Sequence, residues 1–120
     1  MTTTARGKYG ENLACQFLEK QGYKIIERNF RIRGGEIDIV AQEDNVLVYV
    51  EVKTRSQGLF GVPEESVTFF KLRFLERAAK FYRANRKNIK LPNQERIDVV
   101  SVDISEEKPH FKHIKNAGFY

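Results

Sequence analysis

The chain has a single cysteine, Cys15, among its 120 residues, so it cannot form an intramolecular disulfide. It has no apolar run as long as a membrane span, and its first residues lack the hydrophobic core of a secretory signal peptide. It also has neither a phosphate-binding P-loop nor a glycine-rich dinucleotide motif. These absences argue against a secreted disulfide scaffold and a membrane protein, and they favour a cytoplasmic location.

The composition that remains is ordinary for a globular protein. Hydrophobic residues make up 41% of the chain and charged residues 31%. A chain of 120 residues predicts one domain spanning residues 1–120. Its formal net charge of +5 favours a polyanionic partner, nucleic acid first of all, although many basic proteins bind no polyanion.

The most informative pattern is in residues 34–55. Two stretches of alternating polar and apolar residues flank Asp44 and Asn45, which tolerate the backbone conformation of a tight turn. This pattern predicts a β-hairpin whose first strand ends near Glu43 and whose second strand starts near Val46.

The register of this hairpin brings charged residues together. A loop of Asp44 and Asn45 sets Asp38 opposite Glu51, and Glu36 opposite Lys53. Two carboxylates that face each other across a hairpin repel, whereas a hard cation such as Mg²⁺, Mn²⁺ or Ca²⁺ would stabilise them. A solvated hairpin face with a Glu36–Lys53 pair is the alternative interpretation.

Two amphipathic helices are predicted, over residues 2–22 and 66–88. Gly22 is expected to end the first helix, and Glu11 lies at the edge of its buried stripe, where it either faces a neighbouring sheet or is exposed to solvent. On the second helix the predicted core residues are Val67, Phe70, Phe74, Leu75, Ala78, Phe81 and Tyr82, so its aromatic residues are interpreted as core and not as base-stacking platforms.

The opposite surface of the second helix is basic: it carries seven cations, at positions 71, 73, 77, 80, 83, 86 and 87, against Glu76. Because solvated helix faces usually mix charges, we expect phosphate contacts here, with a solvated surface as the alternative. The residues expected to contact phosphate are Lys71, Arg73, Arg77 and Lys80 on this helix, and Arg28, Arg31, Arg33 and Arg55 near the hairpin.

The remaining segments complete a mixed sheet. Strands are predicted over 23–30, 96–104 and 110–114, which gives the order α-β-β-β-α-β-β and an α/β fold with helices flanking the sheet. Residues 54–65 are predicted to form a mobile loop near substrate. Asp98 is expected to be a structural acid paired with Arg96 or Lys115, and the spacing of His110 and His113 places them on opposite strand faces, which argues against a zinc site.

Several blocks of the chain together resemble a known family. Asp38, followed on the next predicted strand by Glu51-Val52-Lys53, resembles the PD-(D/E)xK nuclease signature. The resemblance continues over nearly the whole chain, in residues 7–11, 28–31, 34–40, 50–55, 96–100 and 113–117. In this order the blocks resemble the YraN-like family of bacterial proteins, which is similar to archaeal Holliday-junction resolvases.

The resemblance implies a restriction-endonuclease-like core and a metal-dependent endonuclease. Such an enzyme would hydrolyse phosphodiester bonds in nucleic acid, in DNA rather than RNA, and in branched or repair intermediates. A non-catalytic nucleic-acid-binding module of the same fold and a protein-interaction domain with solvated acids are the alternatives. The sequence leaves open whether the chain is a monomer or a homodimer.

The resemblance also implies roles for individual residues. The implied catalytic residues are Glu11, Asp38, Glu51 and Lys53. Mg²⁺ or Mn²⁺ would be held by Asp38, Glu51 and the backbone carbonyl of Val52, while Lys53 would orient the attacking water or stabilise the transition state. Glu11 and Glu36 are further candidate ligands, the latter because it shares the predicted hairpin face.

Overall fold

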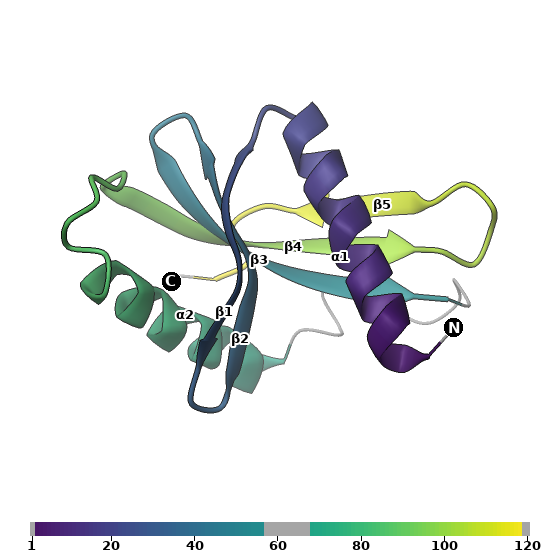
Figure 1. The fold of residues 1–120 in the computed structure, drawn as a ribbon, viewed down its shortest axis with the longest axis horizontal. Helices are drawn as coiled ribbons and strands as arrows, with labels where there is room; N and C mark the ends of the chain where they lie inside the picture. The colour runs from purple at the N-terminus through teal and green to yellow at the C-terminus, as the bar shows by residue number, and fades with distance from the viewer. Residues whose placement is uncertain (1, 57–67, 119–120) are drawn as a thin grey trace.

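The computed structural model describes residues 2–56 and 68–118, which form a five-stranded mixed sheet with a helix on each face (Figure 1). The elements, in chain order, are α1 (Thr3–Lys20), β1 (Lys24–Ile32), β2 (Gly35–Glu43), β3 (Val46–Arg55), α2 (Phe69–Ala84), β4 (Gln94–Asp103) and β5 (His110–Ile114). The predicted α/β class and element order are confirmed.

The strands lie in the sheet in their sequence order, β1-β2-β3-β4-β5. The β3–β4 pair is parallel and the other three pairs are antiparallel. A parallel pair needs a long crossover connection, and α2 lies within the one between β3 and β4. The β2–β3 turn has the predicted register, with Glu43 opposite Val46 and Ile39 opposite Val50, and Asp44 adopts a positive φ of 52°.

Each helix buries one apolar stripe against its own face of the sheet. Ala14 and Leu18 of α1 pack on a layer that includes Val48 and Val50 of β3. On the other face, α2 packs on a second layer; its buried side chains are Phe74, Leu75, Ala78, Ala79 and Tyr82. The two cores fix both helices relative to β2 and β3, the strands that carry the candidate site.

The helix ends agree with their capping residues. Thr2 caps α1 by accepting a hydrogen bond from the backbone N–H of Ala5, and Gly22 follows the end of the helix with a φ of 95°, as expected. The second helix is shorter than predicted: Thr68 is its N-cap, and the helix ends at Ala84. Ser66 and Val67, and most of the predicted loop, lie outside the described residues.

Two predicted core residues of α2 are not in the core. The side chains of Phe70 and Phe81 are 82% and 55% exposed. The stripe that the sheet covers runs through Leu75, Ala78 and Tyr82, so both phenylalanines lie beyond one edge of the buried face. The prediction that the aromatic residues of this helix are core was therefore wrong for these two positions.

Within residues 2–56 and 68–118, no helix is long and apolar enough to cross a membrane.

Candidate functional site

The candidate site begins where β2 and β3 separate. The last ladder pair between these strands on the Asp38 side is Ile39 with Val50. Beyond that pair, one carboxylate oxygen of Asp38 accepts a hydrogen bond from the backbone N–H of Val52, at 2.8 Å. The side chain of Asp38 therefore satisfies a main-chain donor of β3, which fixes its carboxylate between the two strands. The predicted pairing of Glu36 with Lys53 is not part of the ladder that the described strands form.

A cleft of about 480 Å³ opens beside Asp38. Its walls are the first half of α1 and the adjoining parts of β1, β2 and β3. The charged and polar residues that line it include Arg6, Lys8, Glu11, Asn29, Arg31, Glu36, Asp38, Lys53 and Thr54. The lining of the cleft thus contains both carboxylates and the positively charged side chains of arginine and lysine.

Three of these acids lie close together. Glu11, Glu36 and Asp38 each offer one carboxylate oxygen, and the three oxygens lie within 4.8 Å of one another. Oxygen ligands from carboxylates are the set that hard divalent cations such as Mg²⁺, Mn²⁺ and Ca²⁺ prefer. The predicted approach of Glu11 on the first helix to the hairpin acids is therefore found in the structure.

Asn29 links two of the acids, and sequence analysis did not identify it as a site residue. Its side-chain amide donates hydrogen bonds to Glu11 Oε2 and Glu36 Oε1, both at 3.1 Å. Its backbone has a φ of 56°, a conformation that asparagine tolerates better than most residues. The bridge connects α1 to β2 across β1, a relationship that no local sequence pattern encodes.

Arginine side chains neutralise the same two acids. Arg28 donates to Glu11 Oε1 at 2.9 Å, and Arg31 lies 3.2 Å from Glu36. Arg28 is thus tied to Glu11, whereas Arg31 keeps an exposed side chain while it pairs with Glu36. The expected phosphate contacts of both arginines stay predictions.

Glu51 is the buried acid of the site, with a side chain that is 5% exposed. Its carboxylate lies 3.5 Å from Lys53 Nζ and 3.7 Å from Lys71 Nζ, and its Oε1 has no hydrogen-bond partner within the described structure. The negative charge of Glu51 also raises the pKa of Asp38, so the two acids are neighbours. The predicted proximity of these two acids is confirmed, although Glu51 is outside the group of three.

The environment of Asp38 favours its protonated form. Burial, followed by the negative charge of Glu51, raises the pKa of Asp38 from 3.8 to about 8, against the opposing hydrogen bond from Val52. A carboxyl group in this position holds a proton near neutral pH, and a divalent cation could replace that proton. The chemistry of the donor set fits a bound cation, as does the Oε1 atom of Glu51, which accepts no hydrogen bond from the described residues.

Gly10 determines how closely α1 approaches β3. A Cβ atom at this position would overlap the side chain of Thr54. The missing side chain lets the helix pack against the strand and brings the adjacent Glu11 into the acid cluster. Gly7, one helical turn earlier, has open space at the corresponding position.

The basic face of α2 differs from the prediction. Lys71 lies 3.7 Å from Glu51, and Arg83 pairs with Glu95. Arg86, which lies beyond the end of the helix, pairs with Glu27, so these three cations have partners within the protein. Arg73 makes a long contact of 3.9 Å to Glu76. Of the four cations expected to contact phosphate on this helix, Arg77 and Lys80 are exposed, and the described residues give neither an ion-pair partner.

Near the hairpin, Arg33 is exposed and Arg55 is half-buried.

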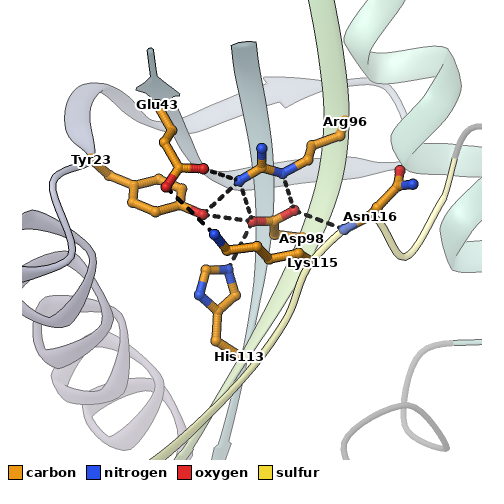
Figure 2. A network of polar contacts seen from close by, with 7 residues as sticks. All are labelled: Tyr23, Glu43, Arg96, Asp98, His113, Lys115 and Asn116. Carbon is orange, nitrogen blue, oxygen red and sulfur yellow. Dashed lines mark hydrogen bonds and ion pairs between the residues drawn. The ribbon is translucent and has the colours of Figure 1, made fainter.

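Asp98 belongs to a separate polar network and not to the acid cluster (Figure 2). It is fully buried and accepts hydrogen bonds from Arg96 at 2.9 Å and from the backbone of Asn116 at 3.0 Å, with His113 at 2.8 Å. Burial raises the pKa of Asp98, but the hydrogen bonds outweigh this effect and leave it below its usual value. The network also contains Tyr23, Glu43 and Lys115. The predicted structural pairing of Asp98 with Arg96 is confirmed, and its bonds to His113 and Asn116 tie the C-terminal segment to the sheet.

The fold and the site define an α/β protein with an acidic, cation-ringed cleft that could hold a metal ion. Residues 10–102 match the family described as Uncharacterised protein family UPF0102. A UPF0102 protein of Geobacter metallireducens is 48% identical over 111 residues, which cover 92% of this chain and 89% of that protein. UPF0102 proteins of Geobacter sulfurreducens and Syntrophomonas wolfei are 47% and 46% identical, again over 92% of this chain and over 86% and 95% of their own lengths. The chain belongs to the UPF0102 family, and its resemblance to the YraN-like family is thereby confirmed.

Proposed function

We propose that this protein is a metal-dependent endonuclease that hydrolyses phosphodiester bonds in nucleic acid, DNA rather than RNA. The observation that carries the proposal is the convergence of Glu11, Glu36 and Asp38 within 4.8 Å in a cleft that also contains Lys53. An acid cluster of this kind suits a divalent cation, and the surrounding positive charge suits a phosphate backbone.

Asp38 is central to the proposed site because other acids lie on both sides of it. Glu11 and Glu36 approach it in the cleft, and Glu51 approaches it from the buried side. These residues would hold one Mg²⁺ or Mn²⁺, whose chemical contribution is to lower the pKa of a bound water and to offset charge on the scissile phosphate. The carbonyl of Val52 stays a further proposed ligand.

The cations of the site have separate proposed roles. Lys53 lines the cleft and would orient the attacking water or stabilise negative charge that develops on the phosphate. Lys71, on the buried side, would hold Glu51 in position. Arg6, Lys8 and Arg31 line the same cleft and would contact neighbouring phosphates.

The proposed reaction is a hydrolysis that needs no redox partner. The oxygen of a water molecule forms a new bond to phosphorus while one phosphoester P–O bond breaks. The proton that the water loses ends on the leaving oxygen through solvent, which leaves one end with a phosphate monoester and the other with a hydroxyl group.

A cleavage assay tests the proposal. Labelled duplex, branched and single-stranded DNA, and matched RNA, are incubated with the protein in Mg²⁺, Mn²⁺ or EDTA. We expect metal-dependent cleavage by the wild type and its loss in Asp38→Asn, whereas Asp44→Asn, at the exposed turn of the same hairpin, should retain activity. Absence of cleavage of every substrate, or equal cleavage by Asp38→Asn, would overturn the proposal.

One observation favours a second candidate, a nucleic-acid-binding module without catalysis. Glu11, Glu36 and Glu51 already have arginine or lysine partners, so their charge is compensated without a metal. In this case the protein would bind nucleic acid with the usual decrease in affinity at high salt, while metal would change neither stability nor the substrate.

A further inference from the structure

A second groove lies on the α2 side of the sheet. It has a volume of about 910 Å³, within the range of roughly 300–1,000 Å³ typical of ligand sites. The tip of the β1–β2 hairpin forms one side and α2 the other; Gly35 at this tip lies against the ring of Phe74. The lining contains four arginines and three large apolar side chains, and none of the described residues that line it is acidic.

The apolar part of the groove offers an aromatic face. Phe81 lines it, and its side chain is 55% exposed. Phe30 lines the other side and packs edge-on against Tyr82, with ring centroids 5.0 Å apart. A flat ligand could stack on Phe81, because the ring presents a face that the protein itself leaves in water.

Two of the four arginines carry charge that the described residues do not neutralise. Arg31 and Arg86 have acidic partners, Glu36 and Glu27. Arg33 and Arg77 are exposed and have no acidic partner in residues 2–56 and 68–118, and Arg77 only approaches the ring of Phe74, at 5.5 Å. The groove therefore suits a ligand that is both anionic and flat.

Arg31, on the edge strand β1, lines both the groove and the acidic cleft, so the two cavities share this residue. A nucleic-acid strand with a phosphate near Asp38 would pass Arg31 and place its next nucleotides in the groove. Bases in a continuous duplex are stacked on both faces by their neighbours, so only an unpaired base can stack on Phe81.

We propose that this groove binds an unpaired nucleotide of the substrate strand, with its base on Phe81 and its phosphates at Arg33 and Arg77. This inference rests on the proposed nuclease function and deepens it. The preferred substrate would be a duplex that adjoins a single-stranded segment, such as a flap, a gap or an overhang, and not a continuous duplex.

Binding measurements with the full chain test this inference. Fluorescence anisotropy, in EDTA to prevent cleavage, would compare a blunt duplex, the same duplex with an oligothymidylate overhang, and free oligothymidylate. We expect Phe81→Ala to weaken binding of the two probes with unpaired bases roughly five- to hundredfold and to leave the blunt duplex unchanged. Phe70→Ala is the matched control, since this residue is more exposed, lies on the same helix and does not line the groove.

The possible outcomes separate this inference from the nuclease proposal. If Phe81→Ala acts only on probes with unpaired bases while no probe is cut with Mg²⁺ or Mn²⁺, the groove assignment holds and the nuclease proposal fails. If the wild type cuts nucleic acid but Phe81→Ala changes no affinity, or changes all affinities equally, the groove assignment fails and the nuclease proposal stands. Phe81-dependent binding of an acidic, aromatic peptide, with none of oligothymidylate, would also overturn the assignment and would give the groove to a protein partner.

Discussion

The carboxylate of Asp38 accepts a hydrogen bond from the backbone N–H of Val52, at 2.8 Å, just past the last ladder pair of β2 and β3. This bond places an acid at the position where the two strands separate and where the cleft opens. It also limits how far the Asp38 side chain can move to avoid the neighbouring acids. The close approach of these acids is therefore built into the backbone, and it has consequences for stability, metal binding and catalysis.

The first prediction concerns the stability of the metal-free protein. The folded state raises the pKa of Asp38 from 3.8 to about 8 by burial and by the charge of Glu51, so the folded protein holds this proton more tightly than the unfolded chain does. The stabilising contribution is complete below pH 4 and is lost as the pH rises to about 8. Asp38→Asn should remove this part of the pH dependence and be more stable than the wild type at pH 8 by on the order of 1–3 kcal/mol.

Urea unfolding in EDTA at pH 5 and pH 8 measures this difference. Asp44→Asn is the control, because Asp44 is exposed and its positive φ is compatible with asparagine. Identical pH dependence in the wild type and Asp38→Asn would show that Asp38 does not hold the proton.

The second prediction concerns metal. A cation that binds only the folded state should stabilise it by about 2.7 kcal/mol at one hundred times its Kd. The effect should be larger at pH 8 than at pH 5, because protons compete for Asp38 at low pH. We expect Asp38→Asn to abolish the rise in Tm with Mn²⁺, and Glu36→Gln and Glu51→Gln each to weaken metal affinity about tenfold or more.

Thermal unfolding against Mn²⁺ concentration provides the measurement, with Asp44→Asn again as the control. If the rise in Tm with Mn²⁺ is unchanged in Glu51→Gln but reduced in Glu36→Gln, the metal is bound by the acids that line the cleft and not by Glu51. A response of equal size in Asp38→Asn and the wild type would rule out the acid cluster as the metal site.

The third prediction concerns the contact between α1 and β3. Gly10→Ala should push the helix away from Thr54 and displace Glu11, which costs about 1–3 kcal/mol of stability and weakens metal binding. Gly7→Ala on the same helix meets no atoms and should stabilise the protein by about 0.5–1 kcal/mol. Adding Thr54→Ala to Gly10→Ala should restore part of both losses.

Chemical denaturation and Mn²⁺ titration of these variants test the contact. If Gly10→Ala behaves like Gly7→Ala, the close approach of helix and strand does not position Glu11.

The fourth prediction separates catalysis from binding. Lys53 lies in the cleft, 3.5 Å from Glu51, and its proposed contribution is mainly to the transition state. Lys53→Ala should lower the single-turnover cleavage rate at least about a hundredfold with little change in affinity for the substrate. Lys8→Ala, which removes another cation that lines the cleft, should mainly weaken binding and make it less dependent on salt.

Rapid-quench kinetics and anisotropy titrations in parallel give the two quantities. If Lys53→Ala lowers the affinity for the substrate by as large a factor as it lowers the cleavage rate, Lys53 binds phosphate in the ground state and does not act mainly in the transition state.

Much of the fold could be predicted because it depends on local patterns. The alternation of polar and apolar residues on both sides of Asp44 and Asn45 predicted two strands. A two-residue loop between them predicted the register that the structure has. The same register predicted that Asp38 and Glu51 are neighbours. The order of helices and strands followed from the change of hydrophobic period along the chain.

The orientation of α2 could not be read from its sequence, because aromatic residues widen its apolar stripe. The series Lys71, Leu75, Ala78 and Tyr82 follows the i, i+4, i+7 spacing of one helix face. Packing against the sheet centres the buried face on this series, which turns Phe81 out to solvent and points Lys71 at Glu51. A cation predicted for the outer surface is thereby part of the site.

The sequence by itself thus determined the elements, the hairpin register and the identity of the charged residues, because each depends on neighbours in the chain. The tertiary structure alone decided that Asn29 bridges Glu11 and Glu36, and that Glu11 reaches Asp38. These contacts join α1, β1 and β2, and their geometry depends on how closely the helix packs on the sheet. That distance is set by the two cores and by the space left at Gly10, which are properties of the packed molecule and not of any one segment.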